Sequence, residues 1–133
     1  MTNITLENRL AIYELLAEYS HHVDNYRGKE WSELFIEGGK LVGPDILIEG
    51  RQAFVDKAQT LKDGVYEYRH SITNIYLEPE SNNEQAVARG YGLVSDWAKK
   101  PAELAIFVEY RFQVVKQDER WSIAEMRVNM PYL

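Results

Sequence analysis

The longest helical pattern in the chain covers residues 5–24, TLENRLAIYELLAEYSHHVD. At 100° per residue, apolar side chains gather on one arc of the helical wheel, and Thr5 is a suitable N-cap. Asp24 shares this arc, so an ionisable group is aligned with residues predicted to face the core. A buried carboxylate needs a cation or a hydrogen-bond donor, and we expect His70 to be that partner. The predicted arc contains Leu6, Leu10, Tyr13 and Ala17, widened on one side by Ile12, Leu16, Tyr19 and Val23.

Shorter elements follow this helix, and long strands follow them. Alternation with a period of two begins after residue 65 and predicts four long strands, whose short gaps favour antiparallel neighbours. We therefore expect an α+β fold in one domain, residues 1–133, with the helices first and a curved antiparallel sheet after them. The pair Gly38-Gly39 is predicted to break the second helix. The predicted helices are 30–35 and 52–62, and the predicted strands are 40–43, 46–49, 66–77, 85–97, 103–116 and 120–130.

Composition narrows the class of protein. The chain has 133 residues, 45% of them hydrophobic and 27% charged, which is typical of a soluble globular protein. A net charge of −6 without a run of Lys or Arg argues against a nucleic-acid partner. No apolar run approaches the ~18 residues that cross a bilayer, and Met1-Thr2-Asn3 lacks the basic start of a signal peptide. The chain has no cysteine, which excludes disulfides and thiolate chemistry. We expect a cytoplasmic protein with no membrane partner.

His70 lies in the first long predicted strand, on a face rich in aromatic side chains. An aromatic face with one histidine and one asparagine is typical of a small-molecule pocket, although a core histidine held by one hydrogen bond fits the same pattern. Small residues on one face of the next strand, from Ala86 to Gly92, leave room for a helix or a ligand. The face predicted for the strand of His70 comprises Tyr66, Tyr68, His70, Ile72, Asn74 and Tyr76.

Tyrosine hydroxyls could assist at such a site. Tyr13 shares the arc of Asp24 and Tyr68 shares the face of His70, so either hydroxyl could hydrogen-bond to a substrate oxygen as charge develops. The alternative is amphipathic packing with the hydroxyl reaching water. Asn74 could orient a ligand or bond to a neighbouring strand. No set of further ligands converges on His70 in the sequence, and no glycine-rich phosphate loop is present, so we expect neither a metal nor a phosphate site.

Several segments together carry a family resemblance that spans nearly the whole chain: YSHHVD (19–24), Trp31 with Leu34-Phe35, Gly50-Arg51, RHSITN (69–74) and WSIAE (121–125). In this order and spacing, the chain resembles the SnoaL-like family of the nuclear transport factor 2-like superfamily. Relatives there include scytalone dehydratase, hexachlorocyclohexane dehydrochlorinase and polyketide cyclases. The resemblance implies a cone-shaped fold, in which a curved antiparallel sheet wraps around helices and encloses a pocket.

The resemblance also implies site residues. In dehydratase-like members, an Asp late in the first helix pairs with a His on the first long strand, and the matching positions are Asp24 and His70. These relatives use no metal or organic cofactor. Met126 stands where many relatives carry arginine, and Arg127 is predicted on the opposite face, which argues against dehydrohalogenation. The superfamily includes non-catalytic members, such as the small subunits of ring-hydroxylating dioxygenases, so the fold alone does not determine function.

The chemistry open to an Asp–His pair is proton transfer. A neutral imidazole is a competent general base, worth typically ~10²–10⁴-fold, and a carboxylate on its other nitrogen fixes the tautomer. We predict a cofactor-independent lyase or isomerase, dehydratase- or cyclase-like, that abstracts a proton next to a carbonyl of a small, partly apolar substrate. The alternative is a non-catalytic small-molecule-binding or structural subunit on the same fold. The predicted catalytic residues are Asp24 and His70, and the predicted substrate-binding residues are Tyr13, Tyr68 and Asn74.

The outer face of the predicted sheet suggests association. An open curved sheet often has its outer face covered by another subunit, and relatives of this kind are commonly oligomeric. Here that face mixes apolar residues with charged and polar ones, so the interface would be mixed rather than dry. We expect a homo-oligomer, most simply a dimer. The polar residues of this face are Arg69, Glu109, Arg111 and Gln113.

Overall fold

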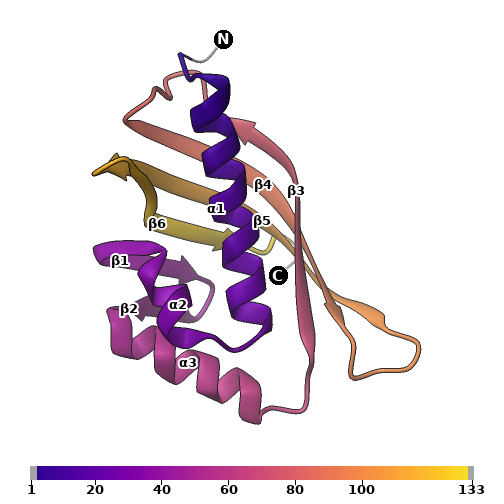
Figure 1. Ribbon diagram of the computed structural model, residues 1–133. Coiled ribbons are helices and arrows are strands. Elements are labelled where there is room, and N and C mark those ends of the chain that lie inside the picture. Colours follow the sequence, from indigo (N-terminus) through magenta and orange to yellow (C-terminus); the bar gives the residue numbers. More distant parts are fainter. Residues whose placement is uncertain (1–2, 132–133) are drawn as a thin grey trace.

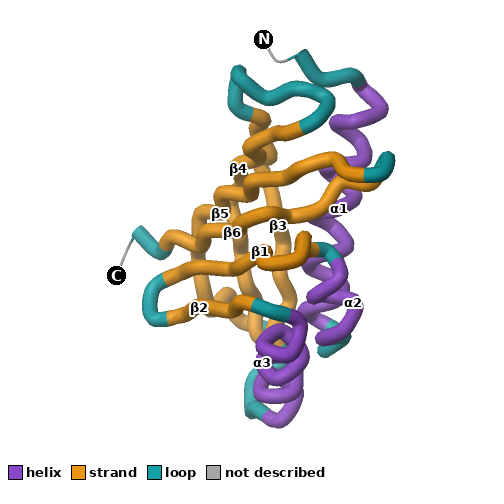
Figure 2. Tube along the Cα trace, turned by 90° about the vertical axis from the view of Figure 1, so that its left-hand side faces the viewer, coloured by secondary structure: helices purple, strands orange, loops and turns teal. Residues whose placement is uncertain are grey.

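The computed structural model describes residues 3–131 and contains three helices and a six-stranded sheet. The elements are α1 (Leu6–Asp24), α2 (Gly28–Glu33), β1 (Phe35–Gly43), β2 (Ile46–Glu49), α3 (Arg51–Asp63), β3 (Tyr68–Leu77), β4 (Gln85–Asp96), β5 (Glu103–Gln117) and β6 (Arg120–Asn129). Helix α1 lies across the sheet, with α2 and α3 near its C-terminal half (Figure 1). All three helices lie on one side of the curved sheet (Figure 2). The predicted α+β arrangement is therefore confirmed.

The strand order is β2-β1-β6-β5-β4-β3. The pairs β3–β4, β4–β5 and β5–β6 are antiparallel, as predicted, and β1 pairs antiparallel with β2. The expectation of an entirely antiparallel sheet is wrong at one junction, because β1 runs parallel to β6. Short connections constrain only strands that follow one another in sequence. They say nothing about β1 and β6, which most of the chain separates.

The boundary between α2 and β1 also differs from the prediction. Helix α2 ends at Glu33, and Phe35 already belongs to β1, which was predicted to start only at residue 40. Gly38 does not break a helix but lies inside β1 with a φ of +78°, where the register with β6 shifts. Glycine adopts this backbone conformation without steric cost. The glycine pair therefore forms an irregularity in the strand, which locally increases its bend.

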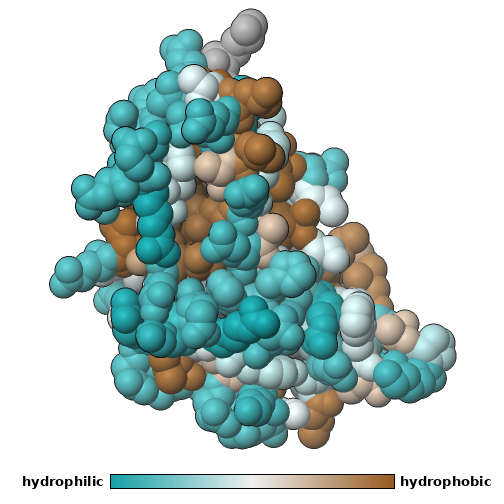
Figure 3. Space-filling model, in the orientation of Figure 1, coloured by the Kyte–Doolittle hydropathy of each residue, from teal (hydrophilic) through white to brown (hydrophobic). Residues whose placement is uncertain are grey.

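Helix α1 begins as predicted but buries a different face. Thr5 Oγ1 accepts the backbone N–H of Asn8, which confirms the N-cap. The predicted core arc is wrong at Leu6 and Leu10, which are 81% and 57% exposed, and hydrophobic surface is visible near the N-terminal end of α1 (Figure 3). An apolar arc this wide does not reveal which half the sheet covers. The buried residues of α1 are Ile12, Leu15, Leu16, Tyr19, Ser20, Val23 and Asp24.

Strand β3 changes face at Asn74. This residue has a φ of +55°, and the register with β4 shifts between Thr73 and Tyr76. The irregularity turns Ile75 toward the core and leaves Tyr76 57% exposed. The predicted continuous face from residue 66 to residue 76 is therefore wrong beyond Ile72, because one inserted residue reverses the alternation of every side chain that follows.

The small residues of β4 make room for other parts of the chain. A Cβ atom at Gly92 would lie 2.4 Å from the ring of Tyr110 and 2.4 Å from Val108. The space predicted beside β4 is thus partly filled by the ring of Tyr110 on the adjacent strand β5.

No helix within residues 3–131 has the length and apolar character to cross a membrane. Met1 and Thr2, used in the expectation about a signal peptide, lie outside the described residues.

Candidate active site

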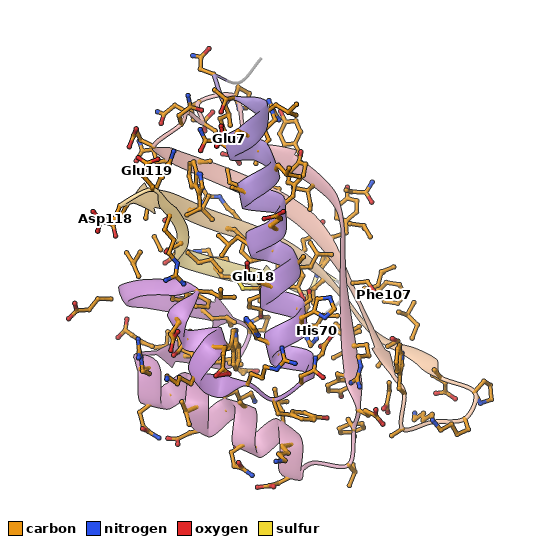
Figure 4. All side chains as sticks on the ribbon, in the orientation of Figure 1. Glu7, Glu18, His70, Phe107, Asp118 and Glu119 are labelled. Atoms are coloured by element: carbon orange, nitrogen blue, oxygen red, sulfur yellow. The ribbon has the colours of Figure 1, made fainter. Side chains whose placement is uncertain are left out.

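Asp24 is the last residue of α1, and His70 lies near the start of β3. Figure 4 shows His70 beside the C-terminal end of α1. Asp24 Oδ1 lies 2.6 Å from His70 Nδ1. The backbone N–H of His70 donates to the same carboxylate, with distances of 3.2 Å to Oδ1 and 3.0 Å to Oδ2. The structure therefore brings together the two residues that the sequence pairs, although their catalytic roles stay a prediction.

The ends of the two elements are held together beside this pair. Helix α1 ends at Asp24, and the chain turns away at Tyr26, which has a φ of +59°. From β3, Arg69 Nη1 reaches the backbone oxygen of Asp24 at 3.5 Å, and its guanidinium group lies over the ring of Trp97 at 4.8 Å. A residue next to His70 thus fastens the strand to the helix end that carries its partner.

The hydrogen bonds determine which nitrogen of His70 is available. A carboxylate can only accept, so the neutral ring must carry its proton on Nδ1 and donate it to Asp24. Nε2 then keeps a lone pair, and no residue in the described part of the chain bonds to it. The side chains of His70 and Asp24 are 16% and 9% exposed, so the pair is largely withdrawn from water. This arrangement leaves one basic nitrogen at the wall of a pocket.

His70 forms part of the wall of two adjoining cavities. The inner cavity, of about 270 Å³, lies between the helices and the concave face of the sheet. The outer cavity, of about 200 Å³, lies where α1 and α3 end and β3 begins. Both have mostly apolar walls with few polar groups, as expected for a small-molecule site. The residues that line both are Val23, Leu61, Tyr68 and His70.

The predicted substrate-binding residues divide into two groups. Tyr68 lines both cavities beside His70, and its ring stacks on that of Tyr66 at 5.1 Å. Burial raises the pKa of the Tyr68 phenol, and the neighbouring Tyr66 and Asp96 raise it further to a smaller extent. Tyr13 and Asn74 are exposed and are not among the residues that line these cavities. Tyr13 lies on the uncovered half of α1, and the bulge of β3 turns Asn74 away from the pocket.

Two other tyrosines, not predicted as site residues, do line the inner cavity. Tyr19 on α1 and Tyr110 on β5 are each 4% exposed, and both pack edgewise or tilted against Phe112. Burial raises the pKa of both phenols, and the charge of Asp24 raises it further. The signal for Tyr110 was present in the sequence as Gly92, the residue whose missing side chain admits the ring.

Cationic groups are scarce at this site. Met126 is fully buried, whereas Arg127 is exposed and its Nε lies 3.0 Å from Glu125 Oε2. The prediction that these two side chains point to opposite faces of the strand is therefore confirmed. Lys57 of α3 is the one Lys or Arg residue among those lining the inner cavity. Within residues 3–131, no three His, Asp or Glu side chains come together as a potential metal site.

Comparison with known proteins places the chain in a family. The SnoaL-like domain profile matches residues 5–127. The chain belongs to the SnoaL-like domain family. The comparison of this SnoaL-like chain with curated proteins gave no match.

Solved structures share the fold of this SnoaL-like chain. A variant of Rv3472 from Mycobacterium tuberculosis, a protein of unknown function, is 27% identical with a TM-score of 0.81, covering 90% of this chain and 69% of that one. An NTF2-like protein with a cystatin-like fold from Novosphingobium aromaticivorans is 21% identical with a TM-score of 0.80, covering 95% and 83%. A candidate scytalone dehydratase from the same species is 21% identical with a TM-score of 0.76, covering 93% and 87%. The fold is therefore NTF2-like, as the resemblance implied.

Proposed function

We propose that the protein is a cofactor-independent lyase or isomerase that removes a proton next to the carbonyl group of a small, partly apolar substrate. The observation that carries this proposal is the 2.6 Å contact between Asp24 Oδ1 and His70 Nδ1 beside a mostly apolar cavity. His70 Nε2 is the proposed base, and Asp24 is its orienting partner. Tyr68, on the wall shared by both cavities, is a proposed substrate contact. A cytoplasmic location belongs to the same proposal.

The reaction begins when His70 Nε2 takes a proton from the carbon next to the carbonyl. The electron pair of the broken C–H bond moves into a carbon–carbon double bond, and the carbonyl oxygen gains negative charge. The imidazolium that forms carries a proton on each nitrogen, and its positive charge faces the carboxylate of Asp24. In a dehydration, the electron pair expels the hydroxyl group of the adjacent carbon, which takes the proton back from His70 Nε2 and leaves as water. In an isomerisation, His70 returns the proton to another carbon. In a cyclisation, the enolate carbon attacks a second carbonyl of the same substrate, and the new alkoxide oxygen takes the proton from His70.

The size of the cavity restricts the substrate. Ligand pockets span about 300–1,000 Å³, and the inner cavity of about 270 Å³ lies just below that range. A compound of one or two rings fits this volume better than a large polycyclic one. Mostly apolar walls with His70 as one of few polar groups favour a partly apolar ligand.

Proton exchange tests the proposal without knowledge of the natural substrate. The protein is incubated in heavy water with a panel of small neutral cyclic and aryl ketones, and deuterium uptake next to the carbonyl is followed by mass spectrometry. We expect uptake with the wild type, and a fall of ~10²–10⁴-fold with His70→Gln or Asp24→Asn. His21→Gln, at an exposed histidine of α1, is the matched control and should exchange like the wild type.

The same experiment distinguishes the second candidate function. A non-catalytic binding or structural subunit would bind ketones in the cavity without promoting exchange. Exchange that survives unchanged in His70→Gln would contradict the proposed base. Binding with no exchange above the solvent rate for any ketone would favour the non-catalytic alternative.

A further inference from the structure

We propose that the hydroxyl groups of Tyr19 and Tyr110 together bind the carbonyl oxygen of the substrate and stabilise its negative charge when His70 removes the proton. This inference rests on the proposed function, because it assigns the groups that would receive the developing charge. It adds two residues to the site and restricts the substrate to compounds whose carbonyl oxygen can enter the inner cavity.

Tyr19 shares α1 with Asp24, and Tyr110 comes from the central part of the sheet. Tyr19 lies on α1, little more than one turn before Asp24, and Tyr110 lies on β5 and reaches the cavity across Gly92 of β4. Both line the same inner cavity as His70. Their rings rest against Phe112 at centroid distances of 6.0 Å and 5.6 Å, which limits how far either phenol can swing.

The cavity holds hydrogen-bond donors that lack acceptors. Neither tyrosine hydroxyl bonds to a residue in the described part of the chain, and the indole Nε1 of Trp31, on the same wall, is buried without a partner. A buried polar group left without a hydrogen bond costs about 1–3 kcal/mol. Trp31 Nε1 is such a group, and an oxygen atom of a ligand in this cavity would accept its hydrogen bond together with those of the two hydroxyls.

The charge of Asp24 determines which ligand fits. Burial and this charge both raise the pKa of Tyr19 and Tyr110, so both phenols stay protonated and remain donors. The same charge disfavours an oxygen that is already anionic when it arrives. Once His70 has taken the proton, its positive charge offsets Asp24, and an enolate oxygen becomes acceptable at the two hydroxyls. The inferred substrate is therefore a neutral ketone or aldehyde rather than a carboxylic acid.

A phenol that mimics the enolate tests this assignment. The probe is 4-nitrophenol, whose anion absorbs visible light and whose neutral form does not, at a pH below the ionisation of the free probe. In the wild type, His70 should take the phenolic proton, and the bound probe should show the anion band. Tyr19→Phe and Tyr110→Phe should each weaken binding about tenfold or more and reduce the band, because each removes one hydrogen bond to a charged oxygen.

Control variants separate this inference from the proposed function. Tyr76→Phe makes the same chemical change at an exposed tyrosine and should bind the probe like the wild type. Thermal unfolding of each variant checks that the fold is retained. Wild-type affinity and band in both Tyr19→Phe and Tyr110→Phe would overturn the inference, as would a wild type that binds no probe. If only His70→Gln loses the anion band and both tyrosine variants keep it, the role of the tyrosines is wrong and the proposed base is retained. If His70→Gln keeps the anion band, His70 is not the base that takes the proton.

Discussion

The carboxylate of Asp24 accepts two different N–H groups of His70, one from the ring and one from the backbone. The ring contact orients the imidazole, and the backbone contact fixes the start of β3 against the end of α1. Hydrogen bonds to a charged group contribute about 1.5–3 kcal/mol each. They therefore offset a substantial part of the cost of withdrawing the carboxylate from water. The same contacts that make Asp24 tolerable inside the protein also present His70 Nε2 to the cavity.

Gly92→Ala should displace Tyr110. The new methyl group would lie 2.4 Å from the ring, and both Tyr110 and Val108 are buried and cannot move into solvent. We expect a loss of about 1–3 kcal/mol in the free energy of unfolding, together with weaker binding of phenols. Chemical denaturation measures the first effect. Gly64→Ala is the matched control, since a methyl group there makes only ordinary contacts, and equal stability of the two variants would contradict the close fit.

Alkaline conditions should destabilise the protein through Tyr19 and Tyr110. Burial raises the pKa of both phenols above the value of about 10 found in unfolded chains. Above that value the unfolded state releases protons that the folded state keeps, so stability falls as pH rises, by about 1.4 kcal/mol per group and pH unit. Denaturation at several alkaline pH values should show a shallower loss in Tyr110→Phe than in the wild type. The exposed change Tyr76→Phe is the control, and parallel slopes for all three proteins would refute the expectation.

Acid should destabilise the protein partly through Asp96. Its carboxylate accepts the backbone N–H groups of Glu67 and Ala98, both at 3.0 Å, and these bonds lower the pKa of Asp96. The resulting stabilisation is present above the unfolded value of about 3.9 and is lost as pH falls through the folded pKa. Asp96→Asn keeps an acceptor oxygen but cannot titrate, so its unfolding free energy should fall less steeply with acid. Asp118→Asn, in the exposed turn between β5 and β6, should leave the wild-type slope in place.

Association through the outer face of the sheet remains a proposal. Tyr91 and Leu93 are exposed on β4, with Glu109 and Phe107 opposite them on β5, and this mixed face is the one predicted to bind a second copy. We expect light scattering to give twice the chain mass of 15.5 kDa at micromolar concentration. Leu93→Glu should shift the protein toward 15.5 kDa, whereas Leu6→Glu on α1 should not. A wild-type particle of 15.5 kDa would contradict the proposed dimer.

The sequence predicted most of the fold because its patterns are strong in the long elements. Helix α1 and strands β3 to β6 carry clear periods, and each begins and ends within about two residues of the predicted position. The start of β1 was missed because Gly38-Gly39 indicates a break equally well after a helix or inside a strand. The parallel pairing of β1 with β6 depends on contacts between distant segments, and no local pattern encodes these.

The site was predictable where one residue stood out against its surroundings. Asp24 was conspicuous as a carboxylate on an apolar arc, and His70 was the ionisable residue on an aromatic face. Tyr13 and Asn74 were placed by extending those regular patterns, which fail where the sheet covers only half of α1 and where β3 bulges. Tyr19 was predicted only as part of the apolar arc, and Tyr110 was not predicted as a site residue, because a one-dimensional pattern does not show that a cavity remains beside a given side chain.

Nitrogen NMR of the imidazole rings tests the central relationship most directly, because it reads which ring nitrogen of His70 carries the proton. Comparison with His70→Gln assigns the signal. In the wild type we predict a neutral ring protonated on Nδ1, with Nε2 bare. In Asp24→Asn the amide N–H can donate to Nδ1, so the proton should move to Nε2 and remove the base from the cavity. A wild-type ring protonated on Nε2, or the same tautomer in both proteins, would contradict the assignment of His70 as a base oriented by Asp24.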